Sequence, residues 1–200
     1  MNNVGICIAL FSTAILTGES FSDEASKKLL LEDFSSTNGK SSYGTQWKFY
    51  SDQVMGGISE GKATSIKTSK GKGMRLEGNV KLENNGGFIQ VALPLKKGWS
   101  SLDASDFKGI RIRVQGNGEP YAIHLRSNQT FLPWHYFAAT FETTGEWQTI
   151  EIPFKDFKPD KGKKTLNTKK LKRIGIVAAF KEMDAQLDIT RVELYSEKGK

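Results

Sequence analysis

The chain contains almost no cysteine, since Cys7 is the only one among its 200 residues. One thiol cannot close an intramolecular disulfide, and a zinc site built from cysteines needs several. Cys7 also lies inside an apolar segment near the N-terminus, which we interpret below as part of a cleavable signal. The mature chain would then have no cysteine nucleophile.

Histidine is also scarce, and the familiar catalytic motifs are missing. His124 and His135 are the only two, and the sequence has no G-x-S-x-G nucleophile elbow, no H-E-x-x-H zinc motif and no phosphate-binding P-loop. We therefore expect no catalytic residues, no metal site and no cofactor, and interpret the protein as a non-enzyme. A structural calcium ion near Asp103 and Asp106 is left open as an alternative, although no calcium-ligand loop is visible.

No apolar run is long enough to cross a bilayer as a helix, which takes about 20 residues. Residues 4–16 are apolar apart from Ser12 and Thr13, as in the hydrophobic region of a secretory signal, although no Lys or Arg precedes them. We expect residues 1–20 to be a signal peptide and 21–28 a polar lead-in, and the mature protein to be periplasmic or extracellular. An uncleaved membrane anchor and a misassigned start codon are the alternatives.

Positive charge is in excess, with a formal net charge of +7 at pH 7. Much of it lies between residues 155 and 173, where only Asp156 and Asp160 oppose the run of Lys155, Lys158, Lys161, Lys163, Lys164, Lys169, Lys170, Lys172 and Arg173. Such a run is either a patch for an acidic partner or anionic lipid, or simply a solvated loop. No aromatic residues interleave with the lysines of 161–170, so we expect no nucleic-acid binding.

Glycine is abundant, with 20 among 200 residues against a usual share of roughly 7%. Residues 74–83 alternate apolar and polar side chains, which is typical of a strand with one buried face. Similar short runs predict about eleven strands in all, at 29–34, 46–50, 63–68, 74–83, 88–93, 110–114, 120–126, 136–143, 147–152, 174–180 and 187–195.

These strands predict an all-β domain over residues 29–196, built as a two-sheet jelly-roll β-sandwich. The turn at 144–146 predicts a hairpin between 136–143 and 147–152. The alternation changes phase near Thr190, which predicts a β-bulge. The only helix candidate is the short stretch 169–172.

Two glycine pairs, Gly56-Gly57 and Gly86-Gly87, adjoin strand-like segments. Glycine there indicates a tight turn, a bulge or a close approach of another backbone or ligand. Asp52 precedes the first pair, and its carboxylate either accepts backbone N–H bonds that fix the loop or points at a ligand. We favour the first role.

The same segments carry a resemblance to the CIA30 family, named for an intermediate-associated protein of mitochondrial respiratory complex I. It extends from about residue 30 to 195 and is carried by Trp47, Ser51-Asp52-x-Val54-Met55-Gly56-Gly57-x-Ser59, Gly78, Asn84-Asn85-Gly86-Gly87-Phe88, the 107–121 segment, Phe141, Trp147, Pro153-Phe154 and Phe157-x-Pro159. The resemblance implies a galactose-binding-domain-like β-sandwich, and roles for relatives in assembling respiratory or photosynthetic machinery.

Our leading hypothesis is a monomeric, non-enzymatic assembly module that binds a protein partner, compatible with a membrane-proximal complex. Its candidate surface combines the loops 51–59 and 84–88 with a polar strand face, and its candidate residues are Asp52, Met55, Gly56, Gly57, Asn85, Gly86, Gly87, Arg113, His124 and Arg126.

The alternative hypothesis is a carbohydrate-binding module of an exported protein. Its candidate platform is Trp134, His135 and Tyr136, together with Trp99. Sugar binding of this kind needs two or more aromatic faces exposed in one groove. Burial of Trp99, Trp134 and Tyr136 would therefore exclude it.

Overall fold

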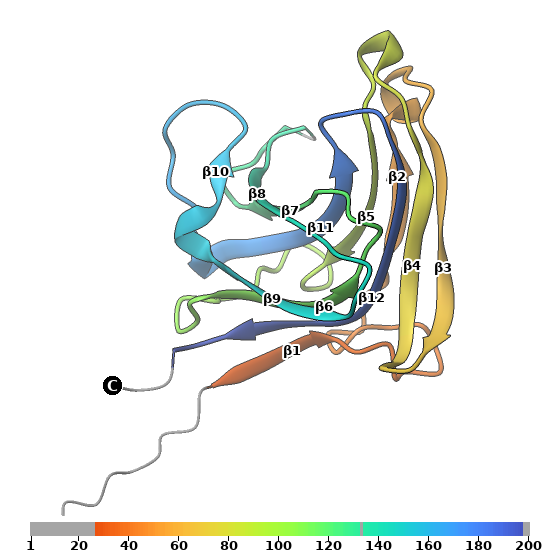
Figure 1. Cartoon of the computed structure of the whole chain (residues 1–200). Coiled ribbons are helices and arrows are strands. Elements are labelled where there is room, and N and C mark those ends of the chain that lie inside the picture. The colour runs from red at the N-terminus through yellow and green to blue at the C-terminus, as the bar shows by residue number, and fades with distance from the viewer. Residues whose placement is uncertain (1–26, 133, 198–200) are drawn as a thin grey trace, which may run out of the picture.

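The computed structural model describes residues 27–132 and 134–197, which form a sandwich of two antiparallel six-stranded sheets. Sheet A has the order β3-β4-β12-β6-β9, with β1 also paired to β12, and sheet B has the order β10-β8-β7-β11-β5-β2 (Figure 1). The predicted all-β, two-sheet jelly-roll fold is confirmed. The expected signal peptide, 1–20, lies outside the described residues.

The strands range from 2 to 13 residues, and four short 3-10 helices lie between them. Sheet A consists of β1 (Lys28–Glu32), β3 (Glu60–Thr68), β4 (Gly71–Val80), β6 (Gly109–Gln115), β9 (Gln148–Pro153) and β12 (Met183–Tyr195). Sheet B consists of β2 (Lys48–Ser51), β5 (Phe88–Pro94), β7 (Tyr121–Ser127), β8 (Phe137–Phe141), β10 (Lys158–Pro159) and β11 (Leu171–Ala179). The 3-10 helices are η1 (Asp52–Met55), η2 (Glu83–Asn85), η3 (Phe154–Asp156) and η4 (Thr168–Lys170).

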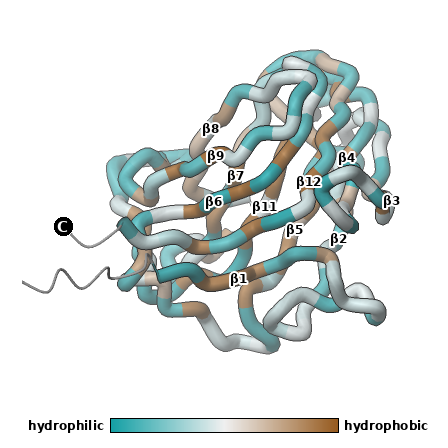
Figure 2. Tube along the Cα trace, turned by 60° about the horizontal axis from the view of Figure 1, so that its bottom comes forward, coloured by the Kyte–Doolittle hydropathy of each residue, from teal (hydrophilic) through white to brown (hydrophobic). Residues whose placement is uncertain are grey.

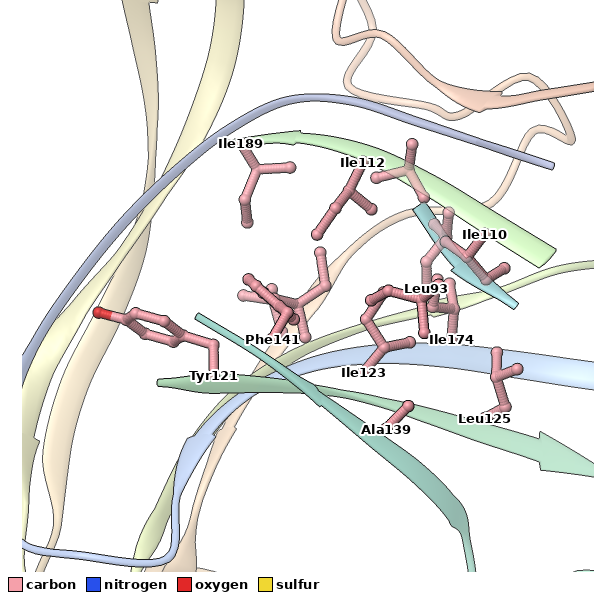
Figure 3. Close-up of a cluster of buried hydrophobic side chains, with 14 of the residues drawn as sticks. Leu93, Ile110, Ile112, Tyr121, Ile123, Leu125, Ala139, Phe141, Ile174 and Ile189 are labelled. Carbon is pink, nitrogen blue, oxygen red and sulfur yellow. The ribbon is translucent and has the colours of Figure 1, made fainter. Parts of the chain in front are cut away.

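The core lies between the sheets, because alternate residues of each strand point inward. Ile110 and Ile112 of sheet A face Ile123 and Leu125 of sheet B, and all four are fully buried (Figure 3). Burying a side chain of this size stabilises the fold by roughly 1.5–3 kcal/mol. The same alternation appears as brown and teal bands along β6 and β12 in Figure 2.

The long strand β12 holds sheet A together. Its first half pairs with β4, while its second half pairs with β6 and also with β1. The register with β6 shifts between Ile189 and Arg191, which confirms the bulge predicted near Thr190.

The predicted hairpin between 136–143 and 147–152 is wrong. β8 pairs with β7 and β10 in sheet B, whereas β9 pairs with β6 in sheet A, so the 144–146 turn carries the chain from one sheet to the other. Both strands still bury alternate residues in the shared core, and their alternation is therefore the same as in a hairpin.

The expected helix at 169–172 is also only partly present. A single 3-10 turn, η4, covers 168–170, and Leu171 already begins β11. Within residues 27–132 and 134–197, we find no helix with the length and apolar character that a membrane span requires.

Candidate functional site

Asp52 is fully buried and joins the two glycine-containing loops. Its carboxylate accepts hydrogen bonds from the backbone N–H of Ser59 (2.9 Å), Gly87 (2.5 Å) and Phe88 (3.2 Å), and from the hydroxyl of Ser59. Burial by itself would raise the pKa of this carboxyl, but the hydrogen bonds outweigh burial and hold its pKa below the ordinary value. The segments 51–59 and 84–88 therefore lie together, as predicted.

The two glycine pairs leave space for the Asp52 carboxyl group. A Cβ at Gly57 would collide with that carboxyl group, and a Cβ at Gly86 would lie only 2.6 Å from its Oδ2. Gly56 and Gly87 adopt positive φ angles of 89° and 118°, which L side chains rarely adopt. These four glycines thus serve the backbone around Asp52.

This geometry corrects the candidate surface of the first loop. Asp52 and Gly57 are enclosed and cannot reach a ligand on the surface. Four of the exposed side chains beside them are apolar, and we call this group the η1 rim: Val54 (71% exposed), Met55 (54%), Ile58 (45%) and Leu82 (48%).

The structure also divides the predicted polar strand face between the two sheets. Arg113 lies in β6 of sheet A, whereas His124 and Arg126 lie in β7 of sheet B, and each points outward from its own sheet. The three side chains therefore do not form one surface. Alternation correctly placed each on the polar side of its strand but could not assign the strand to a sheet.

The outer side of sheet B combines residues from both earlier hypotheses. The rings of His124 and Tyr136 stack in parallel, with centroids 3.8 Å apart and an interplanar angle of 8°. Burial, helped by the charge of Arg173, lowers the pKa of His124 to about 4, so the ring is neutral at pH 7. Its Nε2 is buried, and no residue that the structure describes hydrogen-bonds to it.

Arg173 is the charged residue of this surface that the sequence analysis did not name as a site residue. It lies directly opposite Arg126 in the β7–β11 pairing, and its guanidinium sits over the ring of Tyr50 at 5.8 Å from the centroid. Further along β11, Gly175 lies opposite His124 and next to Gln90. We call this surface the cationic face, and it consists of Tyr50, Gln90, His124, Arg126, Tyr136, Arg173 and Gly175.

The 128–136 loop, between β7 and β8, borders one end of the cationic face. Arg126 anchors it by donating to the backbone carbonyls of Thr130 and Leu132, both at 2.9 Å. Three large side chains of the loop are exposed: Phe131 (85%), Leu132 (43%) and Trp134 (56%). The η1 rim lies at the opposite end of sheet B, where β2 ends and β5 begins.

The predicted aromatic platform is not buried, so the structure does not exclude sugar binding. Trp99 is 94% exposed, Trp134 is exposed with its ring edge-on to His135, and Tyr136 is partly exposed. In contrast, Trp47 packs partly buried against the core, where its Nε1–H donates to Glu32.

The calcium alternative gains no support near Asp103 and Asp106. Asp103 accepts hydrogen bonds from Ser105, and Asp106 forms an ion pair with Lys27 at 2.8 Å. Across the described parts of the chain, no three His, Cys, Asp or Glu side chains are grouped so that they could hold a metal ion.

Two open hollows of about 760 and 870 Å³ lie at the edge of the sandwich, between β2 and the β3–β4 pair.

The two sheets and their topology define a jelly-roll β-sandwich, a fold that this chain shares with carbohydrate-binding modules. The family 11 carbohydrate-binding module of cellulase Lic26A-Cel5E of Clostridium thermocellum superimposes with a TM-score of 0.67 at 17% identity, covering 88% of this chain and 98% of that chain. The family 30 module of cellulase Cel9D-Cel44B of Clostridium thermocellum superimposes with a TM-score of 0.56 at 14% identity, covering 76% and 92%. At such identities the likeness shows the fold alone.

Sequence comparison places the chain more narrowly. The family model described as complex I intermediate-associated protein 30 matches residues 33–189, and the chain therefore belongs to the CIA30 family. The predicted family is thus confirmed. A search of curated proteins found no match.

Proposed function

We propose that this protein is a non-catalytic binding module that helps to assemble a protein complex, with the cationic face of sheet B as its docking surface. The observation that carries the proposal is the combination on one sheet of paired arginines, tyrosines and exposed apolar loops. Arg, Tyr and Trp supply much of the binding energy at protein interfaces.

The exposed apolar residues at both ends of sheet B support a protein partner. The 128–136 loop presents Phe131 and Trp134 at one end, and the η1 rim presents Val54 and Met55 at the other. Large apolar side chains gathered at a polar surface are typical of protein interaction sites. Membership of a family described by its association with a complex I intermediate agrees with this role.

Purification from the native organism tests this proposal. The tagged full-length protein, expressed at its natural level, is cross-linked and purified from the cell envelope and from the cytoplasm separately. We expect a stable complex in the envelope fraction, consistent with an exported protein. Recovery of a free monomer from every fraction would contradict the proposal.

Matched variants locate the surface. Trp134→Ala and Tyr136→Ala alter sheet B and its loop, and we expect each to reduce recovery of the complex. Arg113→Glu alters the outer side of sheet A, and we expect it to leave recovery unchanged. Loss of the complex with the Arg113 variant alone would place the docking surface on sheet A.

Glycan binding is the second candidate function, favoured by the exposed Trp134 close in sequence to the partly exposed Tyr136. The family 11 module, which shares the fold, has been solved in complex with a β-1,3-1,4-mixed-linked tetrasaccharide (TM-score 0.66, 17% identity, covering 86% and 98%). Affinity electrophoresis through mixed-linked β-glucan tests it. Retardation that Tyr136→Ala abolishes would favour the glycan, whereas unretarded migration is expected for a protein-binding module.

A further inference from the structure

Arg126 and Arg173 lie side by side on the cationic face, although like charges repel each other. They are direct partners in the antiparallel pairing of β7 and β11. Among residues 27–132 and 134–197, no carboxylate oxygen lies within 4.0 Å of either guanidinium. Burial lowers the pKa of both, and the charge of Arg173 lowers that of Arg126 further.

The outer side of sheet A is built differently. Arg75 forms a two-pronged ion pair with Asp188, and Arg111 bonds to both Glu151 and Glu193. Sheet A thus neutralises these arginines from neighbouring strands. On sheet B, Arg126 reaches only neutral oxygen atoms of Thr130 and Leu132, and Arg173 rests on Tyr50.

Polar groups of neighbouring strands lie beside the arginine pair. Gly175 is two residues from Arg173 on the same side of β11, and it is buried with the Gln90 and His124 side chains close to it. The Gln90 amide can exchange hydrogen bonds with a polar group, whereas the Nε2 of His124 is buried and has no partner among the described residues.

We propose that Arg126 and Arg173 bind a carboxylate in an acidic segment of the partner protein, an inference that rests on the proposed function. The arginine fork matches the two oxygens of a carboxylate, and neither guanidinium of this cross-strand pair is engaged by a carboxylate of the described residues. A bound carboxylate supplies the negative charge that sheet B lacks at this position.

A protein segment fits this surface better than an acidic glycan. One face of the Tyr50 ring is taken by Arg173, and one face of the Tyr136 ring is taken by His124. Stacking area for sugar rings is thereby reduced. The exposed Phe131 and Trp134 next to Arg126 match the mixed apolar and acidic character of a peptide, and the net charge of +7 favours an acidic one.

Calorimetric titration of the purified full-length protein with hexaglutamate, acetylated and amidated at its ends, tests the inference. We expect binding by the wild type, and no binding of hexaglutamine. Arg173→Gln should weaken hexaglutamate binding about tenfold or more, because it removes a charged hydrogen-bonding partner. Arg113→Gln makes the same charge change on sheet A and should leave the affinity unchanged.

Two outcomes would overturn the inference. One is equal hexaglutamate affinity of Arg173→Gln and wild type, which would mean that the peptide binds the exposed lysines. The other is binding of hexagalacturonate but not hexaglutamate, which would mean that the ligand is an acidic glycan. Arg173→Lys keeps the charge without the planar fork, and its affinity for hexaglutamate should lie between those of the wild type and Arg173→Gln. Thermal unfolding of each variant verifies that it is folded, and we expect Arg173→Gln to keep the wild-type midpoint because it relieves repulsion.

Purification of the complex separates this inference from the proposed function. If wild-type protein recovers no complex, the proposed function fails. If wild type and Arg173→Gln recover the complex equally well, the function stands and the arginine pair is not where the partner docks.

Discussion

Asp52 shows how one buried carboxylate can set the shape of a surface without belonging to it. It ties the 51–59 segment to the 84–88 segment by accepting hydrogen bonds from backbone N–H groups that are buried or partly buried. We expect Asp52→Ala to lower the free energy of unfolding by about 3–5 kcal/mol, since several buried donors lose their acceptor. Urea unfolding measures this.

The control for this prediction is Asp103→Ala. Asp103 is exposed and bonds only to Ser105, so its loss should leave the unfolding midpoint unchanged. An Asp52→Ala protein of unaltered stability that no longer captured its partner would show that Asp52 contacts the ligand after all.

His124 gives the stability a pH dependence of definite sign. Its pKa is about 4 in the folded chain against 6.5 ordinarily, so between these values the unfolded state binds more protons. Stability should therefore fall as the pH drops from 6.5 towards 4, by about 3 kcal/mol. Asp160 opposes the shift and Arg173 reinforces it.

Urea midpoints measured from neutral pH downward test this dependence. In His124→Gln the slope between pH 6.5 and 4 should be much shallower than in the wild type. The loss of Asp52 contacts should appear only at lower pH, below its ordinary pKa of 3.8, because its folded pKa is depressed. Identical slopes for wild type and His124→Gln would contradict the assignment to this ring.

At the scale of strands, an ion pair between two strands should contribute far more than an exposed pair outside the sheets. Arg75 of β4 holds Asp188 of β12 in two-pronged geometry, and the Asp188 side chain is only 9% exposed. Arg75→Met leaves a nearly buried carboxylate without its partner, so we expect a loss of about 3 kcal/mol in the free energy of unfolding.

Lys27→Met provides the matched comparison for Arg75→Met. Its pair with Asp106 is exposed on both sides, and we expect a change below about 0.5 kcal/mol. Chemical denaturation of both variants at low and high salt measures the contrast. Equal effects would show that burial of Asp188 does not govern the strength of its pair.

The strands could be predicted because alternation is local. The phase change near Thr190 located the bulge in the same way. Pairing is not local, which is why the 144–146 turn suggested a hairpin that the chain does not form. For the same reason Arg113 was grouped with His124, although the two lie on different sheets.

The cationic face also depends on strand pairing that the local sequence does not reveal. Arg173 was counted with the lysines of the preceding loop and not as a residue of the strand that follows. Residues 174–179 are all buried, so this strand carries no alternation that would assign Arg173 to an outer side. That Arg173 meets Arg126, however, depends on the β7–β11 register, which only the fold reveals.

At the scale of the whole molecule, the exposed lysines that attract an acidic partner lie apart from the arginine pair that we propose binds it. The lysines between 155 and 172 are exposed and lie mostly between β10 and β11, two strands that Figure 1 labels. Arg126 and Arg173, in contrast, are partly buried on sheet B. Exposed charges act over roughly a Debye length and mainly raise association rates, while close, desolvated pairs mainly slow dissociation.

This separation predicts different kinetics for two variants that bind hexaglutamate. Raising the salt from about 0.05 to 0.5 M should lower the association rate of the wild type about tenfold. Lys163→Gln combined with Lys164→Gln should lower the association rate and leave the dissociation rate unchanged, because both side chains are exposed. Arg173→Gln should instead raise the dissociation rate, because it removes a contact made only in the complex. Surface plasmon resonance separates the two rates, and a lysine variant that dissociated faster would show that the basic loop is itself part of the binding site.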